Sequence, residues 1–356
     1  MNDFRAGPSA RDWRCPMPSG AARAFHAALP GYRPTPLVAL PALAAELGVA
    51  RVLVKDESAR LGLPAFKILG ASWAVARIAA RRAGRATVPD DLEAIAGQRL
   101  TLVTATDGNH GRAVARMAAL LRLDAHVVVP RTMSAGAERA IRAEGATVQR
   151  IDGDYDQAVR RAAALAADRS DAELVQDVAW PGYEEVPGWI VDGYATLPLE
   201  IDEALGGARP DLVVVPVGVG SLAQAVIAHY KAGAGTAILS VEPDSAACVL
   251  ASLRAGEPVT VSTGDTVMAG LNCGTPSSAA WPYLRDGLDG ATTVTDAAAA
   301  RAVADLTTLG VSSGPSGAAG LAGARAVLTG SGADTRREAL GVGAGSVVVL
   351  LSTEGG

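Results

Sequence analysis

The sequence lacks both a long apolar run and a cluster of basic residues. No stretch of about 18 or more apolar residues is free of charge, so we expect no membrane span. The opening MNDFRAGPSARDWR has no apolar core of the kind that a signal peptide needs, and we expect a cytoplasmic protein. The formal net charge is -5 and the arginines are scattered. Because binding to phosphate backbones needs clustered lysine and arginine, we expect no nucleic acid partner.

Cysteine is also scarce, which argues against two further classes of protein. The three cysteines, Cys15, Cys248 and Cys273, lack the spacing of metal ligands, and an odd count does not make a secreted disulfide framework. Cys248 and Cys273 each follow an expected strand end and could approach one another, but spacing alone does not establish a bridge. We therefore predict no metal site and assign these thiols no chemistry.

The length and the residue pattern favour a two-lobed α/β protein. A chain of 356 residues is too long for most single cores. The composition, 49% hydrophobic and 19% charged, is typical of a compact chain and not of a disordered one. Short β-branched runs alternate with helical stretches, and this alternation predicts βαβ units in parallel, twisted sheets with helices on both faces.

The same pattern locates individual elements. We expect helices to begin near Ser134 and Asp154, and a third helix with Asp296 as its N-cap. Residues 25–40 contain three prolines and should form an extended connection instead of a helix. Residues 174–201 interrupt the alternation with aromatic, proline and acidic residues. We interpret this segment as the join between the lobes.

One lysine stands in an unusual position within KDESARLGLPAFKILG, residues 55–70. The stretch begins as a charged turn and is broken by Gly62 and Pro64. Lys67 then stands where the loop enters an alanine-rich helix, among apolar neighbours. Because desolvation disfavours the ammonium form, this position should lower the pKa of Lys67 and suit an amine that reacts with a carbonyl. On this stretch alone, a solvated lysine is the alternative.

A second stretch, TATDGNHG at residues 104–111, follows an expected buried strand. It presents Asp107, Asn109 and His110 at the carboxyl end of a parallel strand, where open α/β sheets hold ligands. The alternative is that the Asp and Asn side chains only cap the following helix. Asp177 ends another expected strand, and it is either a functional acid or an ordinary turn residue.

A third stretch runs from an expected buried strand at 211–217 into GVGS, residues 218–221, and then into a helix. Glycines admit close approach, backbone N–H groups point at an anion, and the helix dipole favours its charge. Phosphate is the natural guest of such a loop. A dinucleotide-binding loop is the competing interpretation, but the spacing is not Gly-x-Gly-x-x-Gly, and no Gly-Lys-Ser/Thr follows as in a P-loop.

Together these pieces resemble the fold-type II pyridoxal-phosphate enzymes, which include the tryptophan synthase β chains, and within them the diaminopropionate ammonia-lyases. The resemblance covers nearly the whole chain after Arg33. It rests on these segments in order: GLPAFKILGAS, ATDGNHGRAVA, QDVAWPGYEEVPGWIVDGY, VGVGSLAQAV, VEPDSAAC, MAGLNCGTP, SGPSGAAG and STEGG.

The resemblance implies a homodimeric α/β enzyme that holds pyridoxal 5'-phosphate in the cleft between two lobes. We expect a large cofactor-binding domain of residues 1–70 and 193–356, and a smaller mobile domain of residues 71–192. Lys67 would carry the cofactor, and Asn109 would face its ring hydroxyl. The remaining contacts implied are, for the phosphate, Gly218, Val219, Gly220, Ser221 and Leu222, and for the pyridine nitrogen, Ser352 or Thr353.

The implied reaction is α,β-elimination of a 2,3-diaminopropionate-like or serine/threonine-like amino acid to a 2-oxo acid and ammonia. Lys67 would take the Cα proton from one face and Asp107 would serve the other face, while Asp177 would bind or protonate the leaving amine. The alternatives are β-replacement, as in cysteine synthases, and a non-catalytic subunit that only holds the cofactor. Two departures from the ammonia-lyase pattern bear on the substrate, because Pro315 and Thr275 each stand where an acid is expected.

Overall fold

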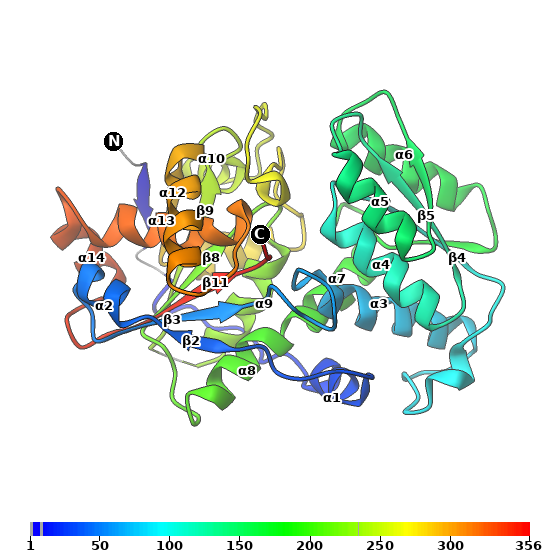
Figure 1. Cartoon of the computed structure of the whole chain (residues 1–356), viewed down its shortest axis with the longest axis horizontal. Coiled ribbons are helices and arrows are strands. Elements are labelled where there is room, and N and C mark those ends of the chain that lie inside the picture. The colour runs from blue at the N-terminus through cyan, green and yellow to red at the C-terminus, as the bar shows by residue number, and fades with distance from the viewer. Residues whose placement is uncertain (1–2, 8–9, 234) are drawn as a thin grey trace. The chain divides into compact units, whose positions relative to one another are not determined.

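The computed structural model describes residues 3–7, 10–233 and 235–356. The chain divides into two compact units (Figure 1). The first unit consists of Met1–Ser19, Arg33–Phe66 and Leu197–Gly356, and the second of Gly20–Tyr32 and Lys67–Thr196. Residues 20–32 thus group with the second unit, whereas the sequence had placed them in the large domain. One passage of the chain between the units falls at Phe66 and Lys67.

The first unit is built on a seven-stranded sheet with the order β1-β10-β9-β8-β11-β3-β2. The inner strands are parallel, and the two edge strands, β1 and β2, pair antiparallel with their neighbours. Parallel strands covered on both faces read as continuous apolar runs, and every residue of the central strand β8 is buried. The strands are β1 (Phe4–Ala6), β2 (Leu37–Ala39), β3 (Arg51–Asp56), β8 (Leu212–Pro216), β9 (Ala237–Pro243), β10 (Gly290–Val294) and β11 (Val347–Ser352).

Small residues let one helix of the first unit lie close against the sheet. Helix α13 is buried along most of its length and packs on β8, β9, β10 and β11. A Cβ at its Gly323 would lie 2.3 Å from Val241, so only glycine fits there. The helices of this unit are α2 (Pro41–Leu47), α8 (Thr196–Ala204), α9 (Ser221–Tyr230), α10 (Cys248–Ala255), α11 (Trp281–Gly287), α12 (Asp296–Thr308), α13 (Pro315–Leu328) and α14 (Ala333–Leu340), with a short 3-10 turn at Ala269–Leu271.

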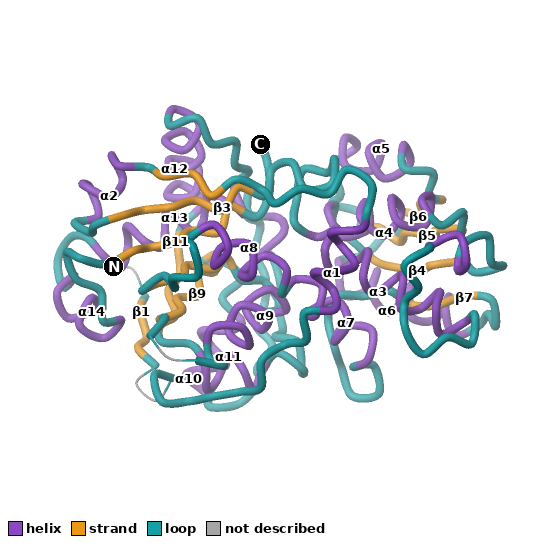
Figure 2. Tube along the Cα trace, turned by 90° about the horizontal axis from the view of Figure 1, so that it is seen from below, coloured by secondary structure: helices purple, strands orange, loops and turns teal. Residues whose placement is uncertain are grey.

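The second unit contains a four-stranded, fully parallel sheet with the order β6-β5-β4-β7. Figure 2 shows these strands in orange with the helices of the same unit around them. The strands are β4 (Thr101–Ala105), β5 (Asp124–Val129), β6 (Thr147–Arg150) and β7 (Ala172–Leu174). The helices are α1 (Ala21–Ala28), α3 (Lys67–Arg82), α4 (Asn109–Leu120), α5 (Ala135–Ala143), α6 (Tyr155–Ala167) and α7 (Glu185–Tyr194), with a 3-10 turn at Leu92–Ile95. The α/β class with parallel sheets, expected from the sequence, is confirmed.

Two of the three predicted helix starts are confirmed. Ser134 caps α5, and Asp154 forms a capping box with Gln157 at the start of α6. The third prediction is off by one residue, because Thr295 caps α12 and accepts from Ala298 N. Asp296 accepts instead from Thr266 Oγ1 and from Val267 N.

Two connections predicted from proline content contain helices. Helix α1 extends to Ala28, so the extended conformation expected for residues 25–40 is wrong at its beginning. The segment 174–201, interpreted as a join, contains α7. Its Pro187 lies in the first turn of that helix, where a backbone N–H would have no acceptor within the helix, so proline costs no hydrogen bond there. Proline there marks a helix start and not a break.

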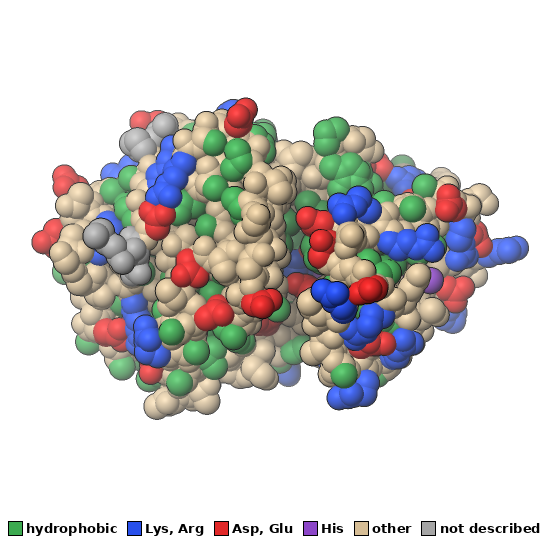
Figure 3. Space-filling model, turned by 90° about the horizontal axis from the view of Figure 1, so that it is seen from above, with side chains coloured by type: hydrophobic (Ala, Val, Ile, Leu, Met, Phe, Trp, Pro, Cys, Tyr) green, Lys and Arg blue, Asp and Glu red, His purple; other side chains and the backbone are tan. Residues whose placement is uncertain are grey.

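Among the helices of the described residues, none combines the length and the apolar character that crossing a membrane requires. On the face shown in Figure 3, lysine and arginine side chains are interspersed with aspartate and glutamate side chains.

Candidate active site

Lys67 is the first residue of α3, and the crossing of α3 with α7 sets its surroundings. A Cβ at Gly70 would lie 2.5 Å from the ring of Tyr194, and one at Gly193 would lie 2.4 Å from the carbonyl oxygen of Leu69. Glycine at both positions therefore lets the two helices touch. The contact brings the ring of buried Tyr194 to 5.9 Å from Lys67 Nζ.

Lys67 and Asp177 form an ion pair within the second unit. Lys67 Nζ donates to Asp177 Oδ2 at 2.5 Å, and 22% of the lysine side chain is exposed against 7% of the aspartate side chain. Burial by itself would lower the pKa of Lys67, but the charge and the hydrogen bond of Asp177, with smaller contributions from other residues, together outweigh it and the pKa is raised. Tyr194 and Asp107 contribute in the same direction. The expected lowering of this pKa is therefore wrong, because a carboxylate from a distant segment meets the amine.

Asp177 is oriented from the C-terminal end of β4 through its neighbour Gln176. The buried Gln176 amide oxygen accepts from Ala105 N at 3.0 Å, and its NH₂ group donates to Asp177 Oδ1 at 3.4 Å. Burial alone would raise the pKa of Asp177, yet the nearby Lys67 and then His110 hold it well below its ordinary value. The carboxylate is therefore ionised.

His110 is a residue of this site to which the sequence assigned no role. Its Nε2 donates to the carbonyl oxygen of Val175 at 2.8 Å, and its Nδ1 lies 3.8 Å from Asp177 Oδ2. Burial lowers the pKa of His110, so the ring is neutral near pH 7 with Nδ1 unprotonated. The motif TDGNH contains the residue, but only the fold shows that it reaches Asp177.

Asp107 and Asn109 stand at the start of α4, after β4. Asp107 is exposed and lies one residue before Gly108, the N-cap of the helix, and Asn109 is the first helical residue. Thr106 provides a cap, since its Oγ1 accepts from Gly108 N at 2.9 Å and from Gly111 N at 3.0 Å. The helix start therefore has a capping hydroxyl besides the two side chains weighed from the sequence.

The glycine loop before α9 lies in the first unit. Gly220 has a φ of +100°, and a Cβ there would lie 2.7 Å from Leu284. A Cβ at Gly218 would lie 2.9 Å from Cys273 Sγ. Ser277 N donates to the carbonyl oxygen of Val219 at 2.8 Å and holds the loop from outside. Within the described residues, no side chain caps α9 from its N-cap, so the loop offers an anion-binding backbone.

Both Cys248 and Cys273 adjoin this loop as thiols. Cys248 Sγ donates to the carbonyl oxygen of Gly218 at 3.7 Å. Burial raises the pKa of the Cys248 thiol, which makes it unreactive as a nucleophile.

The end of β11 carries the predicted hydroxyl contacts. Ser352 and Thr353 are 1% and 5% exposed. Ser352 Oγ donates to Ser313 Oγ at 2.8 Å, and the carbonyl oxygen of Thr353 accepts from Phe66 N at 3.2 Å. This strand end therefore lies beside the segment that leads into Lys67.

The described residues fit pyridoxal phosphate. A helix N-terminus preceded by a glycine loop suits a phosphate, and an accessible lysine amine at a helix start suits a carbonyl. The sequence contains three lysines, and the side chains of Lys55 and Lys231 are only 1% and 4% exposed. Lys67 is therefore the lysine that a cofactor could reach. Within the described part of the chain, no group of three His, Cys, Asp or Glu side chains could hold a metal ion.

Asp177→Asn is expected to reverse the shift of the Lys67 pKa. Without the carboxylate, burial remains, so this pKa should fall below its ordinary value of about 10.4. In the wild type, the lowered Asp177 pKa stabilises the fold above about pH 4, and this stabilisation is lost as the pH falls. The raised Lys67 pKa stabilises below about pH 10 and ceases to do so above it.

The variant should therefore be less stable than the wild type by about 3 kcal/mol near neutral pH, and the difference should shrink in acid. Urea unfolding across the pH range measures this. Asp171→Asn, which breaks a surface pair with Arg169, is the control and should cost less than about 1 kcal/mol. An Asp177→Asn effect of equal size at about pH 3 and pH 7 would refute the assignment.

Comparison with known proteins extends the likeness to the whole chain. A family model described as pyridoxal-phosphate dependent enzyme matches residues 28–353. Diaminopropionate ammonia-lyase of Escherichia coli strain K12 is 38% identical over 353 residues, which cover 94% of this chain and 87% of the relative.

Solved structures agree with the sequence match. A crystal structure of the Escherichia coli diaminopropionate ammonia lyase in complex with D-serine has a TM-score of 0.91 at 35% identity and covers 100% of this chain and 94% of its own. A second structure of that lyase, in complex with an aminoacrylate-PLP azomethine reaction intermediate, has a TM-score of 0.90 at 34% identity and the same coverage.

Proposed function

We propose that this chain, which belongs to the family of pyridoxal-phosphate-dependent enzymes, eliminates ammonia from 2,3-diaminopropionate or a close analogue. It is an ammonia-lyase that uses pyridoxal phosphate. The identity of the substrate and the roles of the residues are the proposal. The observation that carries it is the ionised Asp177 beside Lys67, which places a carboxylate able to bind a second amino group next to the amine that would hold the cofactor.

When bound, pyridoxal phosphate withdraws electrons and makes the Cα proton of an amino acid removable. Lys67 would hold it through Nζ. Asn109 would face its ring hydroxyl, and Ser352 or Thr353 would meet its pyridine nitrogen with a hydroxyl. The phosphate would be bound by the loop residues Gly218, Val219, Gly220, Ser221 and Leu222.

Two groups can move a proton at Cα. Lys67 Nζ would take it on one face as a neutral amine. Asp107 serves the other face with a carboxylate that is exposed and acts electrostatically on Lys67. A general base of this kind contributes roughly 10²- to 10⁴-fold to the rate.

The charge on Asp177 favours a diamino acid over serine. A β-ammonium group already carries the proton with which it leaves as ammonia, so it needs a carboxylate that binds it and no acid. A β-hydroxyl needs a proton donor, and Asp177 as a carboxylate has none to give. Asp177 thus selects by charge, and neutral His110 at 3.8 Å adds no competing positive charge.

The proposal is tested by comparing kcat/KM for pyruvate release from 2,3-diaminopropionate and from serine. We expect diaminopropionate to be preferred by at least about tenfold, the size of one charge-assisted hydrogen bond. β-Replacement is the second candidate. Added sulfide should leave pyruvate release from diaminopropionate unchanged, whereas loss of pyruvate with formation of cysteine would establish replacement.

Gly220→Asp is expected to weaken cofactor binding at least about tenfold, since it adds bulk and negative charge to the anion-binding loop. Titration of cofactor-free protein with pyridoxal phosphate measures the affinity. Gly256→Asp is the control for backbone strain, because Gly256 also has a positive φ, of +80°, while no atom lies within 4 Å of its Cβ position. Equal losses in both variants would mean that strain alone is responsible.

The homodimer and the cytoplasmic location remain predictions. So does the absence of a nucleic acid partner.

A further inference from the structure

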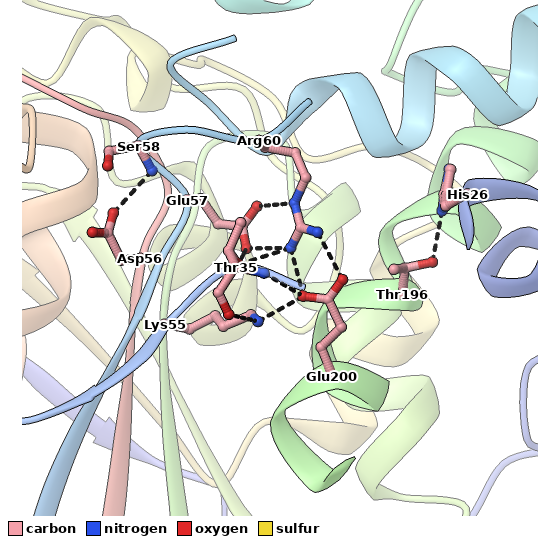
Figure 4. A network of polar contacts seen from close by, with 9 residues as sticks. All are labelled: His26, Thr35, Lys55, Asp56, Glu57, Ser58, Arg60, Thr196 and Glu200. Atoms are coloured by element: carbon pink, nitrogen blue, oxygen red, sulfur yellow. Dashed lines mark hydrogen bonds and ion pairs between the residues drawn. The ribbon is translucent and has the colours of Figure 1, made fainter. Parts of the chain in front are cut away.

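Four buried charged residues of the first unit form a cluster of ion pairs and hydrogen bonds (Figure 4). Lys55, Glu57 and Arg60 come from the end of β3 and the following loop, and Glu200 comes from α8. Each of these four residues is at most 1% exposed. The sequence had indicated a charged turn at residues 55–60. The structure adds that these charges point inward and neutralise one another.

Arg60 is the centre of the cluster. Its Nε donates to Glu57 Oε2 at 2.8 Å, and its Nη1 donates to Glu200 Oε1 at 2.7 Å. Its Nη2 donates to Glu57, Glu200 and Thr35 Oγ1 at 2.7, 2.8 and 2.9 Å. Burial alone would raise the pKa of Glu200, but hydrogen bonds from Arg60 and the charges of Arg60 and Lys55 lower it to about 2. All three guanidinium nitrogens are therefore committed.

The chain turns sharply directly after Arg60. Leu61 and Gly62 both have positive φ values, of 51° and 75°, and Leu63 N donates to the carbonyl oxygen of Arg60 at 2.9 Å. A leucine rarely adopts this left-handed conformation, which persists only where its surroundings enforce it. Along the chain, Arg60 directly precedes the strained turn, and Lys67 follows it.

The far end of the segment is held by the C-terminal residues. Gly355 N donates to the carbonyl oxygen of Pro64 at 2.8 Å, and Phe66 N donates to that of Thr353 at 3.2 Å. The residue before Lys67 is therefore hydrogen-bonded to the strand end that carries the predicted pyridine contacts. The loop is therefore anchored at both ends: by the buried charged cluster before the turn, and by hydrogen bonds to the C-terminal residues after it.

We propose that Arg60 is a positioning residue for Lys67. Its contacts with Glu57, Glu200 and Thr35 hold the strained turn and so fix the conformation of the loop that ends directly before Lys67. Well-packed apolar residues often stabilise a fold at least as much as a buried ion pair does. Stability alone therefore does not explain four buried charges. The planar guanidinium of arginine binds its three partners at fixed angles, and contacts of this kind can hold the turn in one conformation. The inference rests on the proposed role of Lys67.

The test compares Arg60→Met and Arg60→Lys with Lys231→Met. Lys231 and Asp289 form another buried ion pair of the first unit, at 2.7 Å with side chains 4% and 1% exposed, so breaking it is a matched loss. The first readout uses cofactor-free protein: the rate at which an amine-reactive reagent modifies Lys67, the accessible one of three lysines. The second is the rate at which borohydride-fixable cofactor attaches to it, and the third is kcat/KM for pyruvate.

Arg60→Met should lower kcat/KM and the attachment rate about 100-fold, the loss expected from a misplacement of about 1 Å. Its Lys67 modification rate should also change. Arg60→Lys keeps the positive charge but lacks the planar guanidinium. Relative to Arg60→Met, it should therefore recover thermal stability more than kcat/KM. Lys231→Met should lower the melting temperature by as much as Arg60→Met does. It should change the modification rate, the attachment rate and kcat/KM by less than about threefold, the ordinary spread between unrelated sites.

Equal rate losses in Arg60→Met and Lys231→Met at equal melting temperatures would overturn the inference. If Arg60→Met does not fold, Thr35→Val is the second variant, because it removes one acceptor of Arg60 and one donor to Glu57. Unchanged rates in that variant would also overturn it. A wild type that attaches cofactor at Lys67 but releases no pyruvate contradicts the proposed function alone, and the attachment rates still decide the role of Arg60.

Discussion

Lys67→Ala protein should bind no cofactor covalently and should release pyruvate at least about 10⁴-fold more slowly than the wild type. The loss reaches the upper end of what one positioned base supplies, because the same amine also holds the cofactor. The other two lysines cannot substitute, since their side chains are 1% and 4% exposed and each is paired with a carboxylate. Visible absorbance of the purified variant and a pyruvate assay measure both effects.

Borohydride reduction followed by peptide mapping locates the attachment. With three lysines in the chain, the expected outcome is one labelled peptide, the one that contains Lys67. Lys231→Ala is the control and should keep the label and the absorbance. A label on Lys55 or Lys231 in the wild type would overturn the assignment.

Asp107→Asn should damage turnover of one enantiomer of the substrate by roughly 10²- to 10⁴-fold and spare the other. If Lys67 removes the Cα proton on one face and Asp107 on the opposite face, the loss of the carboxylate affects only the enantiomer whose proton points toward Asp107. A capping side chain would behave differently. Asn and Asp cap helices about equally well, so the expected change in stability is under about 1 kcal/mol.

Pyruvate release from each enantiomer, with a melting curve of each protein, separates these roles. Thr106→Val is the matched control, because Thr106 Oγ1 accepts from two backbone N–H groups at the start of α4. That variant should lose stability, by about 1 kcal/mol, without favouring one enantiomer. Small and equal losses for both enantiomers in Asp107→Asn would return Asp107 to a capping role.

Local patterns predicted the architecture well. The family, the α/β class, the cofactor and the class of activity expected from the sequence are confirmed. Helix starts at Ser134 and Asp154 are confirmed because capping is a local interaction between residues three apart. The glycine loop is likewise local, since strand, loop and helix are consecutive in the chain.

The failures come from contacts between distant segments. Lys67 and Asp177 are 110 positions apart, so apolar neighbours indicated a lowered lysine pKa where the ion pair raises it. Arg60 and Glu200 are 140 positions apart, so the sequence indicated a charged turn but not the buried cluster that it forms with α8. Helix α1 was missed for the same reason. Its His26 is fully buried and forms hydrogen bonds with Thr196 and the carbonyl oxygen of Leu69, and no local pattern shows these contacts.

The ratio of ammonia to pyruvate formed from 2,3-diaminopropionate tests the proposed reaction most directly. Elimination releases the β-amino group, and hydrolysis of the product then releases the α-amino group. Purified protein with pyridoxal phosphate should therefore give two ammonia per pyruvate, and Lys67→Ala protein should give neither. Ammonia without pyruvate, or no ammonia from this substrate while serine still yields pyruvate, would contradict the proposal.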